Sequence, residues 1–171
     1  MKILQEIREQ DVFPETIQVV SEKYDYRESV RAIIIDLGGK VALLSLKLFN
    51  TQKLPGGGIE NNEDMKDALK REVLEETGCN VKKFRYIGTV IEYRDQTHLK
   101  QISHCFIVNK FKYTAKISLT DHEKAQGAEI LWTKDINEAI SMLEANKPEN
   151  YPGKFIKLRD IAILNAAKKE S

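Results

Sequence analysis

Residues 54–79 read LPGGGIENNEDMKDALKREVLEETGC, the most informative segment of this sequence. A proline and three glycines at 55–58 end a strand and let the backbone approach another group closely. Asn61 or Asn62 can then cap the N-terminus of a helix, and Gly78 can close its C-terminal end. The stretch therefore predicts a strand, a glycine-rich loop and one amphipathic helix.

Three glutamates of this predicted helix, Glu72, Glu75 and Glu76, lie on an unexpected face. At about 3.6 residues per turn they continue the face of Met65 and Leu69, while lysines occupy the opposite side. Carboxylates gathered on a partly buried face repel one another unless a cation lies among them. Oxygen donors without paired His or Cys are typical of Mg²⁺ or Mn²⁺ sites and not of Zn²⁺ sites. The helix therefore predicts a divalent-metal site.

The spacing of the fixed residues resembles the Nudix box of the MutT/Nudix hydrolases, G-x5-E-x7-R-E-U-x-E-E-x-G-U, in which U is a bulky aliphatic residue. Gly57 and Glu63 take the first two fixed positions, and the run 71–78 takes the other five. The departure is Cys79, a small hydrophobic residue in the final U position. The box covers 23 of 171 residues, and the flanking segments also resemble the α/β/α sandwich of this family.

The resemblance implies an enzyme that cleaves a diphosphate linked to another moiety, usually a nucleoside, by attack of water at phosphorus. It implies Mg²⁺ as the cofactor, with Mn²⁺ as a substitute, because anionic phosphates and glutamates need metal ions between them. Arg71 would belong to the catalytic set by holding a box glutamate in position. The implied metal ligands are Glu72, Glu75, Glu76 and the backbone carbonyl of Gly56. The residues implied to support the site structurally are Gly57, Glu63 and Gly78.

The proton acceptor and the substrate-binding residues are less determined. Family members use either a box glutamate or one from a downstream loop. Glu123 is our downstream candidate for a base or metal ligand, with Glu129 as the alternative; both are equally compatible with plain surface positions. Lys53 precedes the glycine-rich loop and could reach a phosphate, and Arg94 is a similar case, although both also suit solvated positions. Tyr93 could stack on a base.

The remaining segments indicate an α+β protein with a mixed sheet between helices. Five segments should be strands: 30–35, 41–46, 84–93, 102–111 and 128–132. The first two are joined by a Gly-Gly turn and are expected to pair as a hairpin. Helices are expected at about 135–145 and 154–169. We expect one domain over 1–171, with an N-terminal strand extension over about 1–28 that includes the β-rich stretch 16–20.

The charge composition is nearly balanced. Lys and Arg number 27 and Asp and Glu number 26, so the formal net charge is +1. This argues against a nucleic-acid polymer or a membrane surface as partner, since such binders usually carry a basic excess. The N-terminus has no apolar signal region, and two cysteines make no disulfide framework, so we expect a cytoplasmic location. A homodimer through the N-terminal strand and C-terminal helix is left open.

The substrate is expected to be a small nucleotide. Markers of the NADH and coenzyme A pyrophosphatases are not matched, and a nucleoside triphosphate is the preferred substrate. Alternatives are an ADP-sugar or dinucleotide pyrophosphatase and a non-catalytic, nucleotide-sensing Nudix-like module. An isoprenoid diphosphate isomerase would need an activated cysteine, and Cys105 has no visible activating partner.

Overall fold

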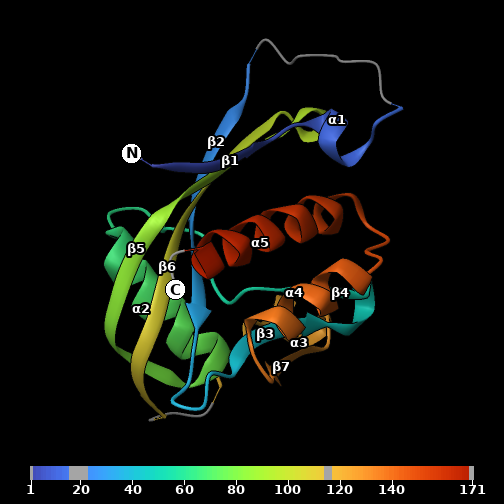
Figure 1. Cartoon of the computed structure of the whole chain (residues 1–171). Helices are drawn as coiled ribbons and strands as arrows, with labels where there is room; N and C mark the ends of the chain where they lie inside the picture. Colours follow the sequence, from blue (N-terminus) through green and yellow to red (C-terminus); the bar gives the residue numbers. More distant parts are fainter. Residues whose placement is uncertain (1, 16–22, 114–116, 170–171) are drawn as a thin grey trace.

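A computed structural model describes residues 2–15, 23–113 and 117–169, in which the strands form two sheets (Figure 1). The larger sheet has the order β1 (Ile3–Ile7), β5 (Cys79–Arg94), β6 (Leu99–Tyr113), β2 (Asp25–Ile34). The smaller sheet has the order β4 (Thr51–Lys53), β3 (Val41–Leu46), β7 (Ala128–Thr133). The helices are α1 (Glu9–Val12), α2 (Met65–Thr77), α3 (Asp121–Ala125), α4 (Ile136–Ala145) and α5 (Tyr151–Lys169). Short 3₁₀ helices span Lys47–Phe49 and Asp95–Thr97.

The larger sheet is mixed and lies between helices. Strand β6 pairs antiparallel with β5 and parallel with β2, while β1 pairs parallel with β5. Alternate residues of β2 serve opposite faces, because side chains alternate along a strand. Val30 joins the core cluster of Leu69 and Val73 from α2, whereas Ile33 joins the cluster of Phe155 from α5. The predicted α+β class and α/β/α arrangement are therefore confirmed.

The expected hairpin of 30–35 and 41–46 is wrong. The Gly-Gly turn does form, because the amide of Gly39 donates to the carbonyl of Asp36 at 3.1 Å. Beyond an isolated bridge between Ile35 and Val41, however, the two strands enter different sheets. Strand β2 instead pairs along its length with β6, and β3 pairs with β4 and β7. The turn signal was correct, but long-range pairing decided the partner of each strand.

Helix α2 begins later than expected. Asp64, and not Asn61 or Asn62, caps it, since its carboxylate accepts from the amides of residues 66 and 67. Met65 is 41% exposed, so it does not belong to the inner face assigned to it. Gly78 ends the helix in the left-handed conformation at φ 68°, as its position predicted.

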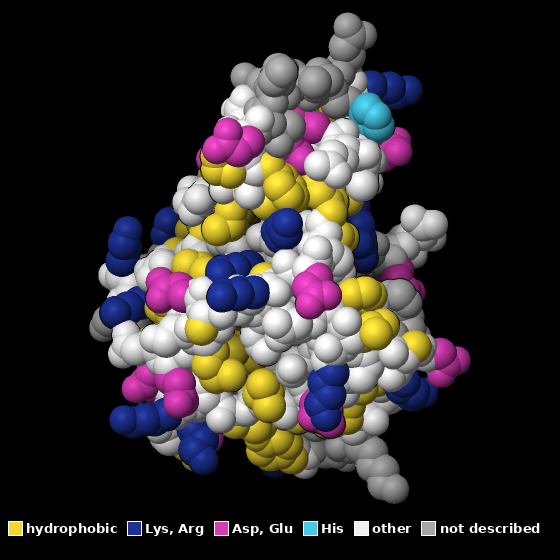
Figure 2. All heavy atoms as spheres, turned by 90° about the vertical axis from the view of Figure 1, so that its right-hand side faces the viewer, with side chains coloured by type: hydrophobic (Ala, Val, Ile, Leu, Met, Phe, Trp, Pro, Cys, Tyr) yellow, Lys and Arg dark blue, Asp and Glu magenta, His cyan; other side chains and the backbone are white. Residues whose placement is uncertain are grey.

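The ends of the chain add a strand and a helix to the central sheet. The β-rich stretch 16–20, where a strand was expected, lies outside the described residues, and strand β1 at Ile3–Ile7 was not predicted. Helix α5 lies across the larger sheet in Figure 1. Within the described residues, no helix combines the length and apolar character needed to cross a membrane. On the face drawn in Figure 2, basic and acidic side chains are interspersed, in keeping with the nearly balanced charge.

Candidate active site

The glycine-rich loop lies directly against strand β2. The amide of Val30 donates to the carbonyl of Gly57 at 2.9 Å, and the amide of Ala32 donates to that of Pro55 at 2.9 Å. A Cβ on Gly56 would lie 2.2 Å from the carbonyl oxygen of Val30, which explains the glycine and its φ of 132°. The loop is thus held between β2 and α2, and its carbonyl groups have fixed positions.

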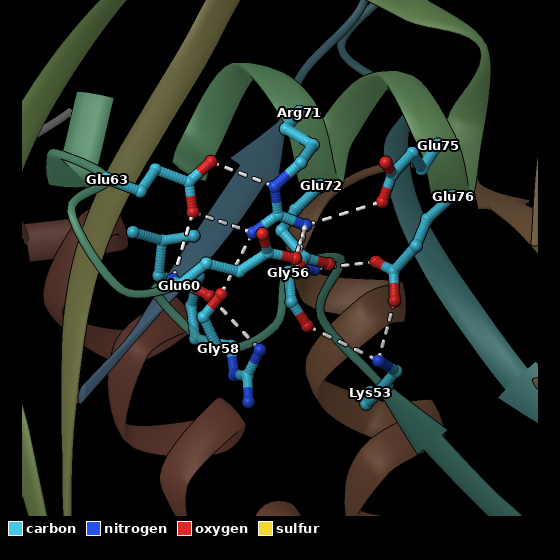
Figure 3. A network of polar contacts seen from close by, with 11 residues as sticks. Lys53, Gly56, Gly58, Glu60, Glu63, Arg71, Glu72, Glu75 and Glu76 are labelled. Atoms are coloured by element: carbon cyan, nitrogen blue, oxygen red, sulfur yellow. Dashed lines mark hydrogen bonds and ion pairs between the residues drawn. The ribbon is translucent and has the colours of Figure 1, made fainter. Parts of the chain in front are cut away.

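Arg71 is the centre of a carboxylate network on α2 (Figure 3). Its Nε and Nη2 donate to the two oxygens of Glu63, both at 2.8 Å, and Nη2 also donates to the carbonyl of Gly58 at 3.0 Å. Its Nη1 donates to Glu72 at 2.8 Å and to Glu75 at 3.4 Å. The hydrogen bonds from Arg71 lower the pKa of Glu63, and those to Glu63 and Glu72 raise the pKa of Arg71. Arg71 therefore ties the loop to the helix and orients two box glutamates.

Glu76 is used differently from the other box glutamates. Its side chain is 1% exposed, and its Oε2 accepts from the amide of Gly56 at 2.6 Å. Its Oε1 accepts from Lys53 at 2.7 Å, and Lys53 also donates to the carbonyl of Gly56 at 3.3 Å. Glu76 therefore binds the base of the glycine-rich loop in this structure.

These groups border a pocket with a volume of about 650 Å³. The box side chains that line it are Arg71, Glu72 and Glu75. The other lining residues are Arg27, Arg31, Leu46, Phe49, Thr51, Lys53, Gly56, Gly57, Gly58, Glu60, Thr120, Gln126, Asn150, Pro152, Gly153 and Ile156. The pocket thus joins acidic groups from α2 to basic groups from β2 and β4.

The donors at this pocket fit a hard divalent cation. Glu72, Glu75 and the carbonyl of Gly56 supply oxygen atoms only, the preference of Mg²⁺ and Mn²⁺. Within residues 2–15, 23–113 and 117–169, no three His, Cys, Asp or Glu side chains are gathered closely enough to form a ready cage. Mg²⁺ commonly uses one or two carboxylates, several waters and substrate phosphates instead of such a cage. The residues present are compatible with that mode of binding.

Two of the predicted substrate-binding residues do not line this pocket. Arg94 is buried, with its Nη2 2.9 Å from Glu92 and its guanidinium over the ring of Phe155. Tyr93 lies under the guanidinium of Arg8, 4.3 Å from the ring centroid. Residue type alone suggested a contact between these two residues and the substrate. Both belong to β5, which places their side chains away from the pocket. Lys53, by contrast, does line the pocket.

The two downstream glutamates, Glu123 and Glu129, lie in different environments. Glu129 forms an exposed ion pair with Lys47 at 2.5 Å and is not among the pocket-lining residues. Glu123 belongs to α3, whose flanking residues Thr120 and Gln126 line the pocket, but its side chain lies outside the described part of the chain.

Sequence reasoning missed Arg27 and Arg31, which line the pocket from β2. Residues four apart in a strand share one face, so their spacing was a usable signal once the strand was known to begin at Asp25. It also missed Asp160 of α5, which is fully buried and accepts from the amide of Leu54 at 2.7 Å. Nothing in the local sequence around Asp160 indicates this contact.

Comparison with known proteins gives a family match for this chain. The sequence profile described as NUDIX domain matches residues 25–153, which is more than half of the chain. Diphosphoinositol polyphosphate phosphohydrolases 3-alpha and 3-beta of Mus musculus are 33% identical to it over 97 residues, covering 56% of this chain and 54% of each relative. The chain therefore spans about half the length of the curated relatives it matches.

Solved structures share the fold. The E. coli ORF135 protein matches with a TM-score of 0.59 at 23% identity, covering 85% of this chain and 91% of that chain. The MutT NUDIX hydrolase from Burkholderia pseudomallei matches with a TM-score of 0.58 at 16% identity, covering 80% of this chain and 98% of that chain. At these identities the likeness concerns the fold alone.

Proposed function

This chain belongs to the Nudix family, and we propose that it is a Mg²⁺-dependent hydrolase acting on a nucleoside triphosphate or another nucleoside diphosphate derivative. It would cleave the diphosphate linkage by attack of water at phosphorus. The observation that carries this proposal is the position of Glu72 and Glu75 at one pocket, beside the fixed glycine-rich loop and oriented by Arg71. The proposed cofactor is Mg²⁺, which Mn²⁺ could replace.

The box residues would have different tasks in binding the metal ion. Glu72, Glu75 and the carbonyl of Gly56 would hold the ion, which supplies polarisation of the phosphoryl oxygens when bound. Glu76 was expected as a further ligand, and its contacts with Lys53 and the amide of Gly56 support a loop-holding task in this structure. Glu76 does not line the pocket, so its side chain would have to move to bind an ion there.

The chain's own groups would position the reactants and receive the proton. Arg71 holds the carboxylates in place, so little rearrangement is needed as charge develops on phosphorus. The attacking water would lose its proton to a carboxylate as the bond from phosphorus to the bridging oxygen breaks. The base would be either a box glutamate at the pocket or Glu123, since α3 borders the pocket.

A more highly phosphorylated substrate is a second candidate. The matched mouse relatives are named as phosphohydrolases of diphosphoinositol polyphosphates, and Arg27, Arg31 and Lys53 add positive charge to the pocket. An ADP-sugar or dinucleotide pyrophosphatase and a nucleotide-sensing module remain alternatives. We further propose a single domain over 1–171 and a cytoplasmic location, which the free thiols of Cys79 and Cys105 would suit.

The test is phosphate or pyrophosphate release from a panel of nucleoside triphosphates, ADP-ribose, dinucleotides and diphosphoinositol phosphates, with and without Mg²⁺. Glu75→Gln keeps the size of the side chain and removes its charge, and we expect its kcat to fall by about 100-fold or more with an unchanged circular dichroism spectrum. An unchanged rate would refute the assignment of Glu75 as a metal ligand. Tight nucleotide binding without turnover on the whole panel would favour the sensing module.

A further inference from the structure

The start of helix α5 forms one wall of the active-site pocket. Residues 150–153, here called the α5 turn, contribute three lining residues: Asn150, Pro152 and Gly153. The amide of Gly153 donates to Oδ1 of Asn150 at 3.0 Å, which closes the turn. These lining residues carry no charge, and the proposed metal ligands lie elsewhere, on α2 and in the glycine-rich loop. The α5 turn is therefore placed to contact a substrate without being part of the proposed metal site.

The remaining residue of the turn, Tyr151, does not line the pocket and is held by the N-terminal segment. Its hydroxyl donates to Oε2 of Glu9 at 2.6 Å. Its ring stacks on that of Phe13, with 5.6 Å between the ring centroids and 6° between the ring planes. The ammonium group of Lys154 lies 4.9 Å from the centroid of the Phe13 ring. Residues 9–13 therefore contact the start of α5 through a charge-assisted hydrogen bond and an aromatic stack.

Glu9 also links the α5 turn to the larger sheet. The residue is 3% exposed, and both of its carboxylate oxygens accept hydrogen bonds. Oε2 accepts from the amide of Asp95 at 3.2 Å, in addition to the hydroxyl of Tyr151, and Oε1 accepts from Nε2 of Gln96 at 3.0 Å. Asp95 and Gln96 belong to the short connection between β5 and β6. Because a buried carboxylate is costly without such partners, Glu9 is held between the sheet and Tyr151.

The α5 turn is also closely packed against β4. A Cβ built on Gly153 would lie 2.9 Å from Oγ1 of Thr51 and 2.8 Å from the Cβ of Pro148. Thr51 begins β4 and itself lines the pocket. The turn is thus restrained by β4 and, through Tyr151, by Glu9 and Phe13. Loss of the second restraint would loosen or shift this wall of the pocket.

We propose that Glu9 and Phe13 are positioning residues of the active site, which act through Tyr151 to hold the α5 turn in the position that binds the substrate. Neither residue lines the pocket. Both precede residues 25–153, the part of the chain that matches the family profile. This positioning rests on the proposed function and extends its site to the N-terminal segment. Loss of either residue should therefore weaken substrate binding more than it slows the chemical step.

The first test measures KM and kcat for the compound of the panel that the wild type cleaves fastest. In Glu9→Gln an amide group replaces a carboxylate to which three donors point, so at least one hydrogen bond is lost. We expect KM to rise by about 10-fold while kcat stays within about 3-fold. Phe13→Leu removes the stacked ring and should act in the same direction. Glu6→Gln changes an exposed carboxylate of the same segment and should leave both constants unchanged.

A rescue variant separates positioning from a general loss of structure. In the double variant Glu9→Gln, Gln96→Glu, the new amide at position 9 can donate to the new carboxylate at position 96. The oxygen of that amide can still accept from Tyr151 and Asp95. KM should therefore return close to the wild-type value, although the double variant differs from the wild type at one more position than Glu9→Gln does.

The second test follows the restraint without turnover. Amide hydrogen exchange in residues 148–156 should become faster by about 10-fold in Glu9→Gln and should slow again in the double variant. Exchange in residues 65–77 of α2 should match the wild type in both variants. Mn²⁺ binding, measured by electron paramagnetic resonance, should keep its Kd because the proposed metal ligands lie outside the α5 turn.

The outcomes separate the positioning from the proposed function. If the wild type is an active hydrolase but Glu9→Gln changes neither KM nor exchange in residues 148–156, the positioning is refuted and the proposed function stands. If no compound of the panel is hydrolysed but exchange responds to Glu9→Gln and to the rescue as expected, the restraint on the α5 turn stands and the proposed function fails. Equal losses in KM, kcat and Mn²⁺ affinity, without rescue, would show a general loss of structure and overturn the proposal.

Discussion

The three consecutive glycines at the pocket differ in what an added side chain would meet. At Gly56 a side chain would meet the backbone of Val30, which cannot move without shifting β2. At Gly57 a Cβ would lie 2.3 Å from Oε1 of Glu72, the flexible end of a side chain. At Gly58 the nearest group is 3.4 Å away on Arg27, an ordinary contact. Gly56 is therefore needed for the fold, whereas Gly57 is needed for the position of Glu72 in the active site.

We expect Gly57→Ala to fold normally and to lose activity. The new methyl group would displace the carboxylate of Glu72, and a misplacement of this kind can cost about 100-fold in kcat. Gly56→Ala should instead lower the free energy of unfolding by about 3 kcal/mol or prevent folding, because both its φ and its space are wrong. Gly58→Ala should show the smallest change of the three.

Thermal unfolding and kcat on the same preparations would distinguish these cases. Full activity in Gly57→Ala would mean that the observed position of Glu72 is not required for the reaction.

Helix α5 contributes to the site, although most of it lies beyond the residues that match the family profile, 25–153. Asp160 of this helix is fully buried and accepts from both the amide of Leu54 and the Nε of Arg159, each at 2.7 Å. Asp160 and Glu92 together raise the pKa of Arg159, against the effect of burial. A buried charge pair thus anchors the residue that leads into the glycine-rich loop.

Asp160→Asn should be strongly destabilising. The amide can still accept from Leu54, but Arg159 would lose the charge nearest to it, and breaking a buried pair costs about 3–5 kcal/mol in the free energy of unfolding. The control is Glu129→Gln, which removes an ion pair whose two side chains are exposed and should change stability by less than about 1 kcal/mol. Urea unfolding of both variants provides the comparison. Equal stability for Asp160→Asn and the wild type would exclude this anchoring task.

Residues 2–15, which precede the family match, also pack into the core of the molecule. Ile7 of β1 is fully buried and belongs to the same core cluster as Phe155 of α5. The carboxylate of Glu9 is buried and accepts from the hydroxyl of Tyr151 at 2.6 Å and from Gln96 at 3.0 Å. Strand β1 therefore links the edge of the larger sheet to the helix that anchors the loop.

Ile7→Ala should lower the free energy of unfolding by about 2–4 kcal/mol, because it leaves a cavity in a core shared by β1 and α5. Ile3→Ala on the same strand is the matched control, since Ile3 is 49% exposed and should contribute less than about 1 kcal/mol. Chemical denaturation measures both. Similar small losses for the two variants would show that β1 is peripheral to the core.

Local patterns predicted most of the acidic helix, although its capping residue and the exposure of Met65 were predicted wrongly. The periodicity of α2, its closure at Gly78 and the contact of Arg71 with two box glutamates follow from spacing within one short segment. The approximate positions of the strands could also be predicted, because β-rich runs and turns are local signals. Arg94 and Tyr93 were predicted to contact the substrate because of their residue types. Residue type does not indicate to which face of a strand a side chain points, and neither residue lines the pocket.

Tertiary structure decided which distant segments meet. Strand β2 was expected to pair with its sequence neighbour, but it pairs with β6 and binds the glycine-rich loop along its other edge. This pairing places Arg27 and Arg31 at the pocket, while α5 brings Asp160 to Leu54 across 106 positions of sequence. Such contacts depend on burial and hydrogen bonding between remote segments, for which a single sequence carries no local signal. The box glutamates and Lys53 could therefore be predicted from local sequence, whereas Arg27 and Arg31 line the pocket only because of how β2 pairs and packs.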